Sequence, residues 1–307
     1  MLEHIFTLEF LASIIRMSTP ILFVAMAAVV GAKANILCIG YEAMMLFAAL
    51  GGVIGSAYTN SLLIGTIVGV ISGVLIALIF GYFVLYLDTT PLLAGLALNT
   101  FGIAGTVFIV FLLTGRKLDT SVLASLRFPN VNIPIIKDIP VIGEILSGHN
   151  LLSYLAVLTV FLVYYLIFKT KLGLQIRAVG ENPEAASSAG IDVKRIKLIA
   201  ILISGVIASF GGMYLSMAHL PYFVTNITAG RGFIGIAAQN LSGGSPIGTT
   251  IATLIFGASM ALGNLAQSFR LPSQFASALP YIMTILGSVI VGIKQNVDKK
   301  KKRKIKE

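Results

Sequence analysis

The sequence predicts an all-α polytopic membrane protein with eight to ten transmembrane or re-entrant helical elements. Hydrophobic residues make up 57% of the 307 residues and charged residues only 11%, whereas a soluble domain carries about 25% charged residues. The mean hydropathy is +0.95. Charge-free stretches, such as those between Glu42 and Asp88 and between Arg231 and Arg270, exceed the roughly 20 apolar residues that cross a bilayer as a helix.

The first elements are harder to delimit than those that follow. Residues 1–19 are amphipathic and end at Pro20, so they either lie in the membrane interface or begin the first span, which continues over 20–31. The apolar stretch 36–56 contains Glu42 and several glycines, which predicts a broken or re-entrant span. The next two predicted spans, 61–86 and 91–113, are uninterrupted.

The second half alternates polar and apolar segments. The predicted spans are 151–168, 196–217, 246–265 and 275–293, and a short element at 228–241 is polar at both ends. If the polar segment 169–197 is cytoplasmic, alternation places the loops 114–150 and 218–227 outside the cell. The C-terminal tail then returns to the cytoplasm only if 228–241 crosses the membrane.

The basic residues are concentrated in two segments. Of the 22 lysines and arginines, 14 lie in 169–197 or in the tail 294–307, and the net charge is +10. The positive-inside rule places both segments in the cytoplasm, and the tail is also placed to touch anionic lipid headgroups. We therefore predict one membrane domain, 1–293, with a cytoplasmic loop at 169–197, and a basic cytoplasmic tail, 294–307. This distribution argues against binding to nucleic acid.

A short polar helix is predicted within the loop 169–197. Asn182 is a good N-cap, and Pro183 fits the first helical position. Glu184 lies in the first turn, where the helix dipole favours a negative charge. Small residues follow, among them Ala185 and Ala186, and Gly190 is a natural stop. Such a helix can dock in a groove of another protein; the alternative is an ordinary polar loop.

Several segments resemble permease subunits of ABC importers, in the class that serves ribose, branched-chain amino acids and nucleosides. Residues 173–197 resemble the loop that couples these permeases to their ATPase. The run NILCIGYEAMML (35–46) is similar to the nucleoside branch's NIGLEGMML, and TAGRGFIGIAA (228–238) to its TAGRGFIALAA. The stretches 16–20 and 204–212 also fit. The chain departs from the family pattern at Ala43, at Lys33 and at 239–244.

This resemblance implies a type II importer permease in a bacterial cytoplasmic membrane. The implied partners are a separate ABC ATPase that binds ATP and Mg²⁺, a second homologous permease subunit, and an extracellular binding protein or lipoprotein. The implied substrate is a nucleoside, with riboflavin, ribose or another neutral solute as alternatives. A secondary transporter or channel is the alternative of another class, and it would require ionisable residues near the bilayer midplane for ion coupling.

Polar side chains in apolar surroundings are the candidates for the substrate pathway, because burying them is costly. These candidates are Asn35, Glu42, Asn99, Arg231, Gln239 and Asn240. Glu42 either faces the pathway or accepts hydrogen bonds from backbone where the span breaks. Arg231 either pairs with an acid or with backbone carbonyls, or helps to shape an external gate. Uncharged amides suit a neutral ligand with base and ribose edges.

No enzymatic chemistry is predicted for this chain. Leu241-Ser-Gly-Gly244 has the letters of the signature peptide of ABC ATPases, but the sequence has no phosphate-binding G-x-x-x-x-G-K-[ST] loop. We therefore expect a glycine-rich turn there. The three histidines, His4, His149 and His219, are far apart in sequence, so no metal site and no bound cofactor are expected.

Overall fold

The computed structural model describes residues 7–123, 125–132 and 147–268, together with isolated residues between 278 and 289, and these residues contain helices and no strand. The helices are α2 (Leu8–Lys33), α3 (Tyr41–Thr59), α4 (Leu62–Leu85), α5 (Pro91–Thr114), α8 (Leu151–Lys169), α9 (Lys171–Glu181), α10 (Pro183–Ser188), α11 (Val193–Tyr214), the π-helix η1 (Leu215–His219), α12 (Arg231–Leu241) and α13 (Pro246–Ser268). Seven are long and apolar enough to span a membrane: α2, α3, α4, α5, α8, α11 with η1, and α13.

Most of the predicted spans are confirmed within a few residues. The predictions for 61–86, 91–113 and 151–168 correspond to α4, α5 and α8. The predicted span 275–293 lies largely outside the described residues, and the tail 294–307 lies wholly outside them.

α2 settles how the first span begins. It runs without interruption through Pro20, and the side chain of Thr7 caps its start by accepting a hydrogen bond from the N–H of Phe10. Residues 8–19 therefore begin the first span and do not form a separate interfacial helix. A proline inside a membrane helix is tolerated where surrounding helices compensate for the lost backbone hydrogen bond, and the stretch from Ser18 to Gly31 is buried.

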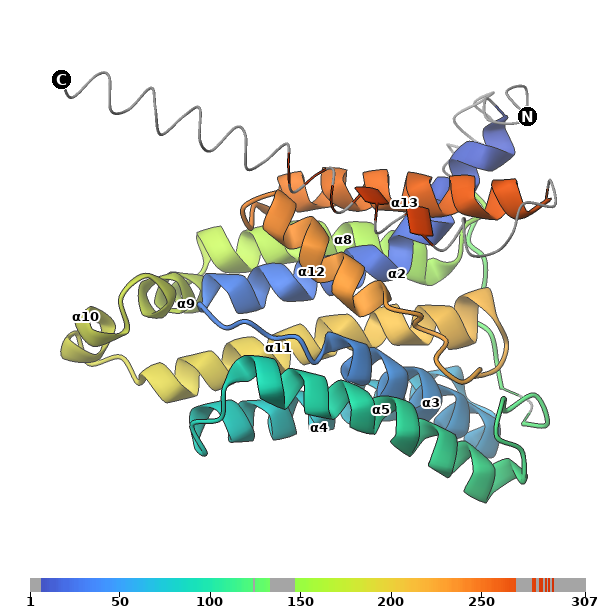
Figure 1. Ribbon diagram of the computed structural model, residues 1–307, viewed down its shortest axis with the longest axis horizontal. Coiled ribbons are helices and arrows are strands. Elements are labelled where there is room, and N and C mark those ends of the chain that lie inside the picture. Colours follow the sequence, from blue (N-terminus) through green and yellow to red (C-terminus); the bar gives the residue numbers. More distant parts are fainter. Residues whose placement is uncertain are drawn as a thin grey trace.

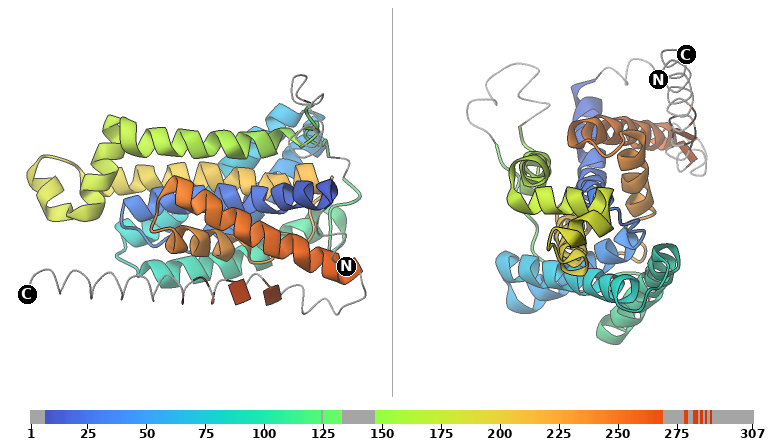
Figure 2. Two further views of the ribbon diagram at one scale, coloured as in Figure 1. Left: turned by 90° about the horizontal axis from the view of Figure 1, so that it is seen from above. Right: turned by 90° about the vertical axis from the view of Figure 1, so that its left-hand side faces the viewer.

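The helices form a central group and an outer group (Figures 1 and 2). α2 and α3 are largely buried inside the protein, whereas α4, α5 and α8 present most of their apolar side chains to the outside. Leu63 and Ile71 of α4 and Phe108 and Leu112 of α5 are at least 60% exposed. Exposed side chains of this kind form the lipid-facing surface of a membrane protein.

Two of the helices begin in the interior of the bundle. The prediction of a broken or re-entrant span over 36–56 is wrong: residues 34–40 are not helical, but α3 then runs through Glu42 and the glycines without interruption to Thr59. α12 is only 11 residues long. The non-helical residues 220–230 precede it and include Asn226, Ala229 and Gly230 with positive φ. Each of these segments is thus an irregular stretch followed by a helix.

The segment that contains α12 reaches from one end of the bundle to the other. We call the two ends the α10 end and the far end; α11 leads from the first to the second (Figure 1). α12 runs back to the α10 end, where a Cβ on Gly244 would lie 3.6 Å from Nζ of Lys33. The stretch 220–241 therefore crosses as loop plus short helix. Ser242, Gly243 and Gly244 then form the expected turn, in which both glycines have positive φ.

Gly65, Gly69 and Gly73, four residues apart on α4, let this helix approach its neighbours closely, as small residues at this spacing do in membrane proteins. A Cβ added to Gly69 would overlap Sδ of Met213, and one on Gly65 would lie 2.8 Å from Cβ of Ser56. These glycines therefore serve the packing of α4 against α3 and α11.

Gly212→Ala is expected to destabilise the fold. A Cβ there would overlap the carbonyl oxygen of Met45 and lie 2.8 Å from its carbonyl carbon, so backbone has to shift. Overpacking of this kind costs about 1–3 kcal/mol. Thermal unfolding of the purified protein measures the effect. Gly105→Ala is the matched control, because a Cβ added there would lie 3.4 Å from the side chain of Phe47, its nearest neighbour. An equal loss of Tm in both variants would contradict the prediction.

Candidate functional site

The predicted polar helix is present as α10, with the predicted caps. The side chain of Asn182 accepts a hydrogen bond from the N–H of Ala185 at 3.0 Å, and Pro183 occupies the first helical position. Glu184 lies in the first turn. Gly190 has a φ of +81°, and its N–H donates to the carbonyl of Ser187 at 2.9 Å. α10 protrudes from the bundle beyond the ends of α8 and α11 (Figure 1).

The surface that α10 offers is narrower than the sequence suggested. Ala186 is only 4% exposed, because it packs into the core of this chain. The small side chains available to a partner are those of Ala185, Ser187, Ser188 and Ala189, which are exposed. The sequence places Ala186 among the small residues available for docking in a partner's groove, but the face of the helix that carries Ala186 packs against this chain's own core.

α9 supports α10 and was not predicted as a helix. The side chain of Thr170 caps its start by accepting a hydrogen bond from the N–H of Gly173. A Cβ on Gly173 would overlap the carbonyl oxygen of Leu166, and one on Gly180 would overlap that of Lys33. α9 is thus wedged between the ends of α8 and α2, which holds α10 in a fixed position relative to the membrane helices.

Glu42 joins the starts of the two interior helices. Glu42 is only 3% exposed. Oε1 accepts a hydrogen bond from the N–H of Gly230, and Oε2 accepts one from the N–H of Gly232, both at 2.7 Å. The N–H groups at a helix start have no intrahelical partner and carry partial positive charge. Glu42, in the first turn of α3, therefore caps α12. Of the two roles considered for it, the structure shows hydrogen bonding to backbone.

Asn99 performs a similar task for α3. From α5, its Oδ1 accepts a hydrogen bond from the N–H of Ala43, and its Nδ2 donates to the carbonyl of Ile39, both at 3.0 Å. Asn99 is buried. Both of its polar atoms are therefore used in holding the irregular segment 34–40 against the first turn of α3.

Arg231 also bonds to backbone. Its Nη1 donates to the carbonyls of Ile227 and Thr228, both at 3.1 Å. These residues belong to the irregular stretch before α12. Among the alternatives, the structure thus shows pairing with backbone carbonyls, and Arg231 stiffens the turn that Glu42 caps.

The other three pathway candidates come together at one cavity, which we call the inner cavity. It has a volume of about 160 Å³ and lies between the end of α2, the segment 34–40 and α12. Its polar lining residues are Asn35, Cys38, Tyr41, Gln239 and Asn240. The hydroxyl of Tyr41 donates to the carbonyl of Ala27 at 3.1 Å. The sequence thus identified the three amides, and the structure adds a thiol and an aromatic ring.

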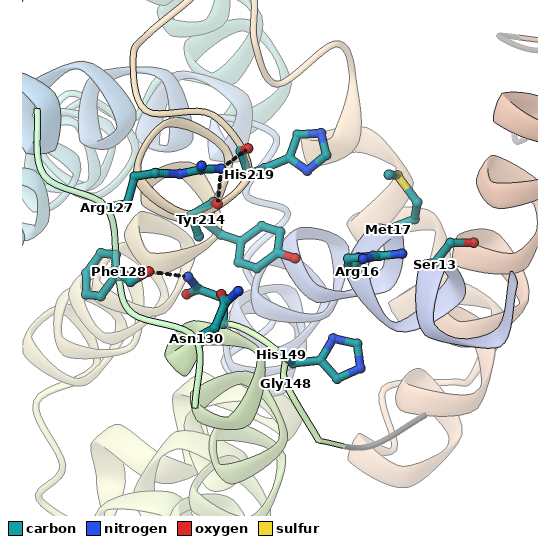
Figure 3. A pocket seen from close by; sticks show the side chains of 12 residues that line it. Ser13, Arg16, Met17, Arg127, Phe128, Asn130, Gly148, His149, Tyr214 and His219 are labelled. Atoms are coloured by element: carbon teal, nitrogen blue, oxygen red, sulfur yellow. Dashed lines mark hydrogen bonds between the residues drawn. The ribbon is translucent and has the colours of Figure 1, made fainter. Parts of the chain in front are cut away.

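A second, larger cavity lies at the far end and was not predicted. This outer cavity has a volume of about 570 Å³, and Figure 3 shows side chains from α2, from the loops and from η1 around it. Its lining residues include Arg16, Arg127, His149, Tyr214 and His219. Among the described lining residues there is no acid, so the cavity is electropositive.

The π-helix η1 forms one wall of the outer cavity. The last carbonyls of η1 have no partner within the helix, and they bond to the neighbouring loop: the N–H of Phe128 donates to the carbonyl of Met217 at 2.8 Å, and the guanidinium of Arg127 donates to the carbonyls of Ala218 and His219. π-turns are frequent at functional sites. No local pattern in the sequence indicated this element or showed that His149 and His219, 70 residues apart in the chain, line the same cavity.

The sequence is similar to transport permeases over most of its length. The profile of the branched-chain amino acid transport system permease component family matches residues 10–288. The nucleoside ABC transporter permease protein NupC of Lactococcus lactis is 30% identical over 90% of this chain and 89% of its own length. The guanosine ABC transporter permease protein NupQ of Bacillus subtilis is 31% identical over 88% of this chain and 87% of its own.

A solved structure shares the fold. The PsaBC structure from Streptococcus pneumoniae, in complex with a Fab, matches with a TM-score of 0.54 over 93% of each chain. The sequence identity is 13%, so this likeness concerns the arrangement of the helices alone.

Proposed function

The chain belongs to the family of permease components of branched-chain amino acid transport systems, and we propose that it is the membrane-spanning subunit of an ATP-driven importer of nucleosides. The observation that carries the substrate class is the inner cavity, where three neutral amides and Tyr41 converge and where the described lining residues include no charged side chain. Amides hydrogen-bond base edges and ribose hydroxyls, and an aromatic ring can cover the face of a base. The two relatives named for nucleoside and guanosine transport support the same class.

Movement of α12 would open the pathway. The inner cavity, at about 160 Å³, is smaller than the roughly 300–1,000 Å³ of sites that enclose a small-molecule ligand. It is closed by α12 on one side and by the segment 34–40 on the other. We propose that α12 swings at its C-terminal end, carrying Gln239 and Asn240, while Glu42 holds its N-terminal end in place.

The buried carboxylate argues against ion-coupled secondary transport. Glu42 is the one buried acid among the described residues, and both of its oxygens already accept hydrogen bonds from backbone. A coupling site needs an ionisable group that can bind and release its ion. Glu42 is instead bound to the start of α12, so the energy for import comes from elsewhere in our proposal.

The proposed energy source is a separate ATPase that binds ATP and Mg²⁺ and docks on the exposed face of α10. A second, homologous permease subunit would complete the pathway, and an extracellular binding protein or lipoprotein would deliver the substrate at the far end, next to the outer cavity. Membrane lipid would surround α4, α5 and α8. Asn35, Gln239 and Asn240 are the proposed pathway residues of this subunit, and Glu42, Asn99 and Arg231 position them.

Cysteine labelling is expected to place α10 in the cytoplasm and the loop after α5 outside. Ser187 and Val122 are exposed at opposite ends of the bundle. In intact cells an impermeant maleimide should label Val122→Cys, and it should label Ser187→Cys only after permeabilisation. The native Cys38 is buried and gives little background. Labelling of Ser187→Cys from outside would reverse the topology. Lys301, a second cytoplasmic position by prediction, lies outside the described residues.

Uptake by the reconstituted complex tests the substrate. Radiolabelled uridine, adenosine and guanosine should enter proteoliposomes only with ATP, and ribose, riboflavin and leucine serve as comparisons. Gln239→Leu should reduce nucleoside uptake, because it removes an amide from the inner cavity and leaves a substrate group unpaired. ATP-dependent uptake of ribose or riboflavin, with none of any nucleoside, would refute the substrate class and leave the importer architecture standing.

A further inference from the structure

A basic cavity lies at the α10 end of the bundle, on the side of the segment 34–40 that faces away from the inner cavity. It has a volume of about 480 Å³ and is formed where α4 turns into α5 and meets the first turns of α11. Lys194 and Lys197 line it, one helical turn apart on α11, and Thr89 and Thr90 contribute hydroxyl groups. Asp88 also lines the cavity, so two ammonium groups stand against one carboxylate.

An apolar groove begins beside this basic cavity. It has a volume of about 590 Å³ and follows α4 and α5 toward the far end, and its lining includes Phe83, Leu93, Ala97 and Phe101. Thr89, in the turn between the two helices, lines both the groove and the cavity. The groove opens to the outer, apolar surface of α4 and α5. A ligand that fills both spaces therefore has an anionic end and a long apolar part.

We propose that the cavity and groove bind one anionic phospholipid, with its phosphate between Lys194 and Lys197 and an acyl chain along α4 and α5. Basic pockets at the ends of membrane helices bind such headgroups. A cytosolic phosphate compound would use the lysines but leave the groove empty, and an acidic segment of a protein partner would do the same. Nζ of Lys194 also lies 5.5 Å from the centroid of the Tyr86 ring, within cation–π distance.

The site adjoins the segment 34–40, and α10 precedes it closely in the chain; both take part in the proposed function. Asn35 and Ile36 line the basic cavity on one face of their segment and the inner cavity on the other. Lys194 follows closely on α10 in the chain. A lipid bound here would brace the segment 34–40 from the membrane side while α12 moves on the opposite side.

Native mass spectrometry of the purified transporter complex tests the site directly. After equilibration with equal amounts of phosphatidylglycerol and phosphatidylcholine, we expect bound phosphatidylglycerol to exceed bound phosphatidylcholine on the order of tenfold, since each lysine near a membrane surface favours an anionic lipid. Lys194→Gln/Lys197→Gln should abolish this preference. Lys169→Gln/Lys171→Gln, which removes the same charge from exposed cytoplasmic-end residues outside the cavity, should keep it.

Two further measurements distinguish a bound phospholipid from other bound anions. Ala97→Phe narrows the apolar groove and should reduce retention of phosphatidylglycerol without changing the lysines. Inorganic phosphate added at millimolar concentration should not displace the lipid. The proposal is overturned if the Lys194→Gln/Lys197→Gln variant keeps the preference for phosphatidylglycerol, or if inorganic phosphate displaces the lipid as well as a competing lipid does. It is also overturned if this variant, in phosphatidylcholine alone, loses ATPase binding. That result would assign the two lysines to the ATPase.

Discussion

Glu42→Leu is expected to abolish transport. The change leaves the N–H groups of Gly230 and Gly232 buried without acceptors, and each orphaned donor costs about 1–3 kcal/mol. α12 then loses its cap, and the turn before it, with Asn226 and Ala229 at positive φ, loses the contact that holds it. We expect ATP-driven uptake near background, a lower Tm and retained membrane insertion.

Glu42→Gln distinguishes charge from geometry. A glutamine offers one acceptor oxygen, so it can satisfy one of the two N–H groups, and its own amide N–H groups would then face the other. We expect reduced uptake and a smaller loss of Tm than with leucine. Glu9→Leu is the matched control, since Glu9 is an exposed acid in the first turn of α2. Normal uptake by Glu42→Leu at normal expression would remove any role for this carboxylate.

Ser187→Arg is expected to uncouple the ATPase without disturbing the fold. Ser187 is exposed on α10, so an arginine there extends into the proposed docking surface and leaves this chain's core untouched. We expect loss of ATPase co-purification and at least a tenfold drop in uptake. A tenfold weaker affinity for the ATPase corresponds to about 1.4 kcal/mol of lost binding free energy. The Tm of the subunit should stay unchanged.

The position of the arginine is decisive for this experiment. Ala186→Arg is a poor probe, because Ala186 is buried within the chain and the larger side chain disrupts α10 itself. Val122→Arg, at an exposed residue of the opposite end, controls for the added charge. If Ser187→Arg binds the ATPase and transports normally, α10 is not the docking element.

Local signals in the sequence were enough to predict the outer helices and α10. The spans at α4, α5 and α8 are continuous apolar runs, and α10 carries its own N-cap, proline and terminal glycine. α9 was missed although Leu172, Ile176 and Val179 recur at helical spacing, because it is short, contains two glycines and takes its position between α8 and α2 from tertiary contacts at Gly173 and Gly180.

The candidate site was predicted in part, because its geometry depends on contacts between residues far apart in the chain. The acceptor groups of Glu42 meet N–H groups 188 and 190 residues away, and no local pattern specifies such a pair. Polarity alone singled out Asn99, Arg231 and the amides of the inner cavity, but it did not separate bracing residues from lining ones. The outer cavity could not be predicted before the fold was known, because its lining residues His149 and His219 come from different segments of the chain.

α11 and η1 form one uninterrupted helix of 27 residues between α10 and the outer cavity. At 1.5 Å per residue it is about 40 Å long, so a tilt of about 5° about one end displaces the other end by about 3.5 Å. A rigid helix of this length turns a small tilt at one end into a larger displacement at the other. A small rocking of α10 by the ATPase would therefore move Tyr214 and His219 as part of the same rigid body. The shape of the outer cavity would then change without a chain of side-chain rearrangements between the two ends.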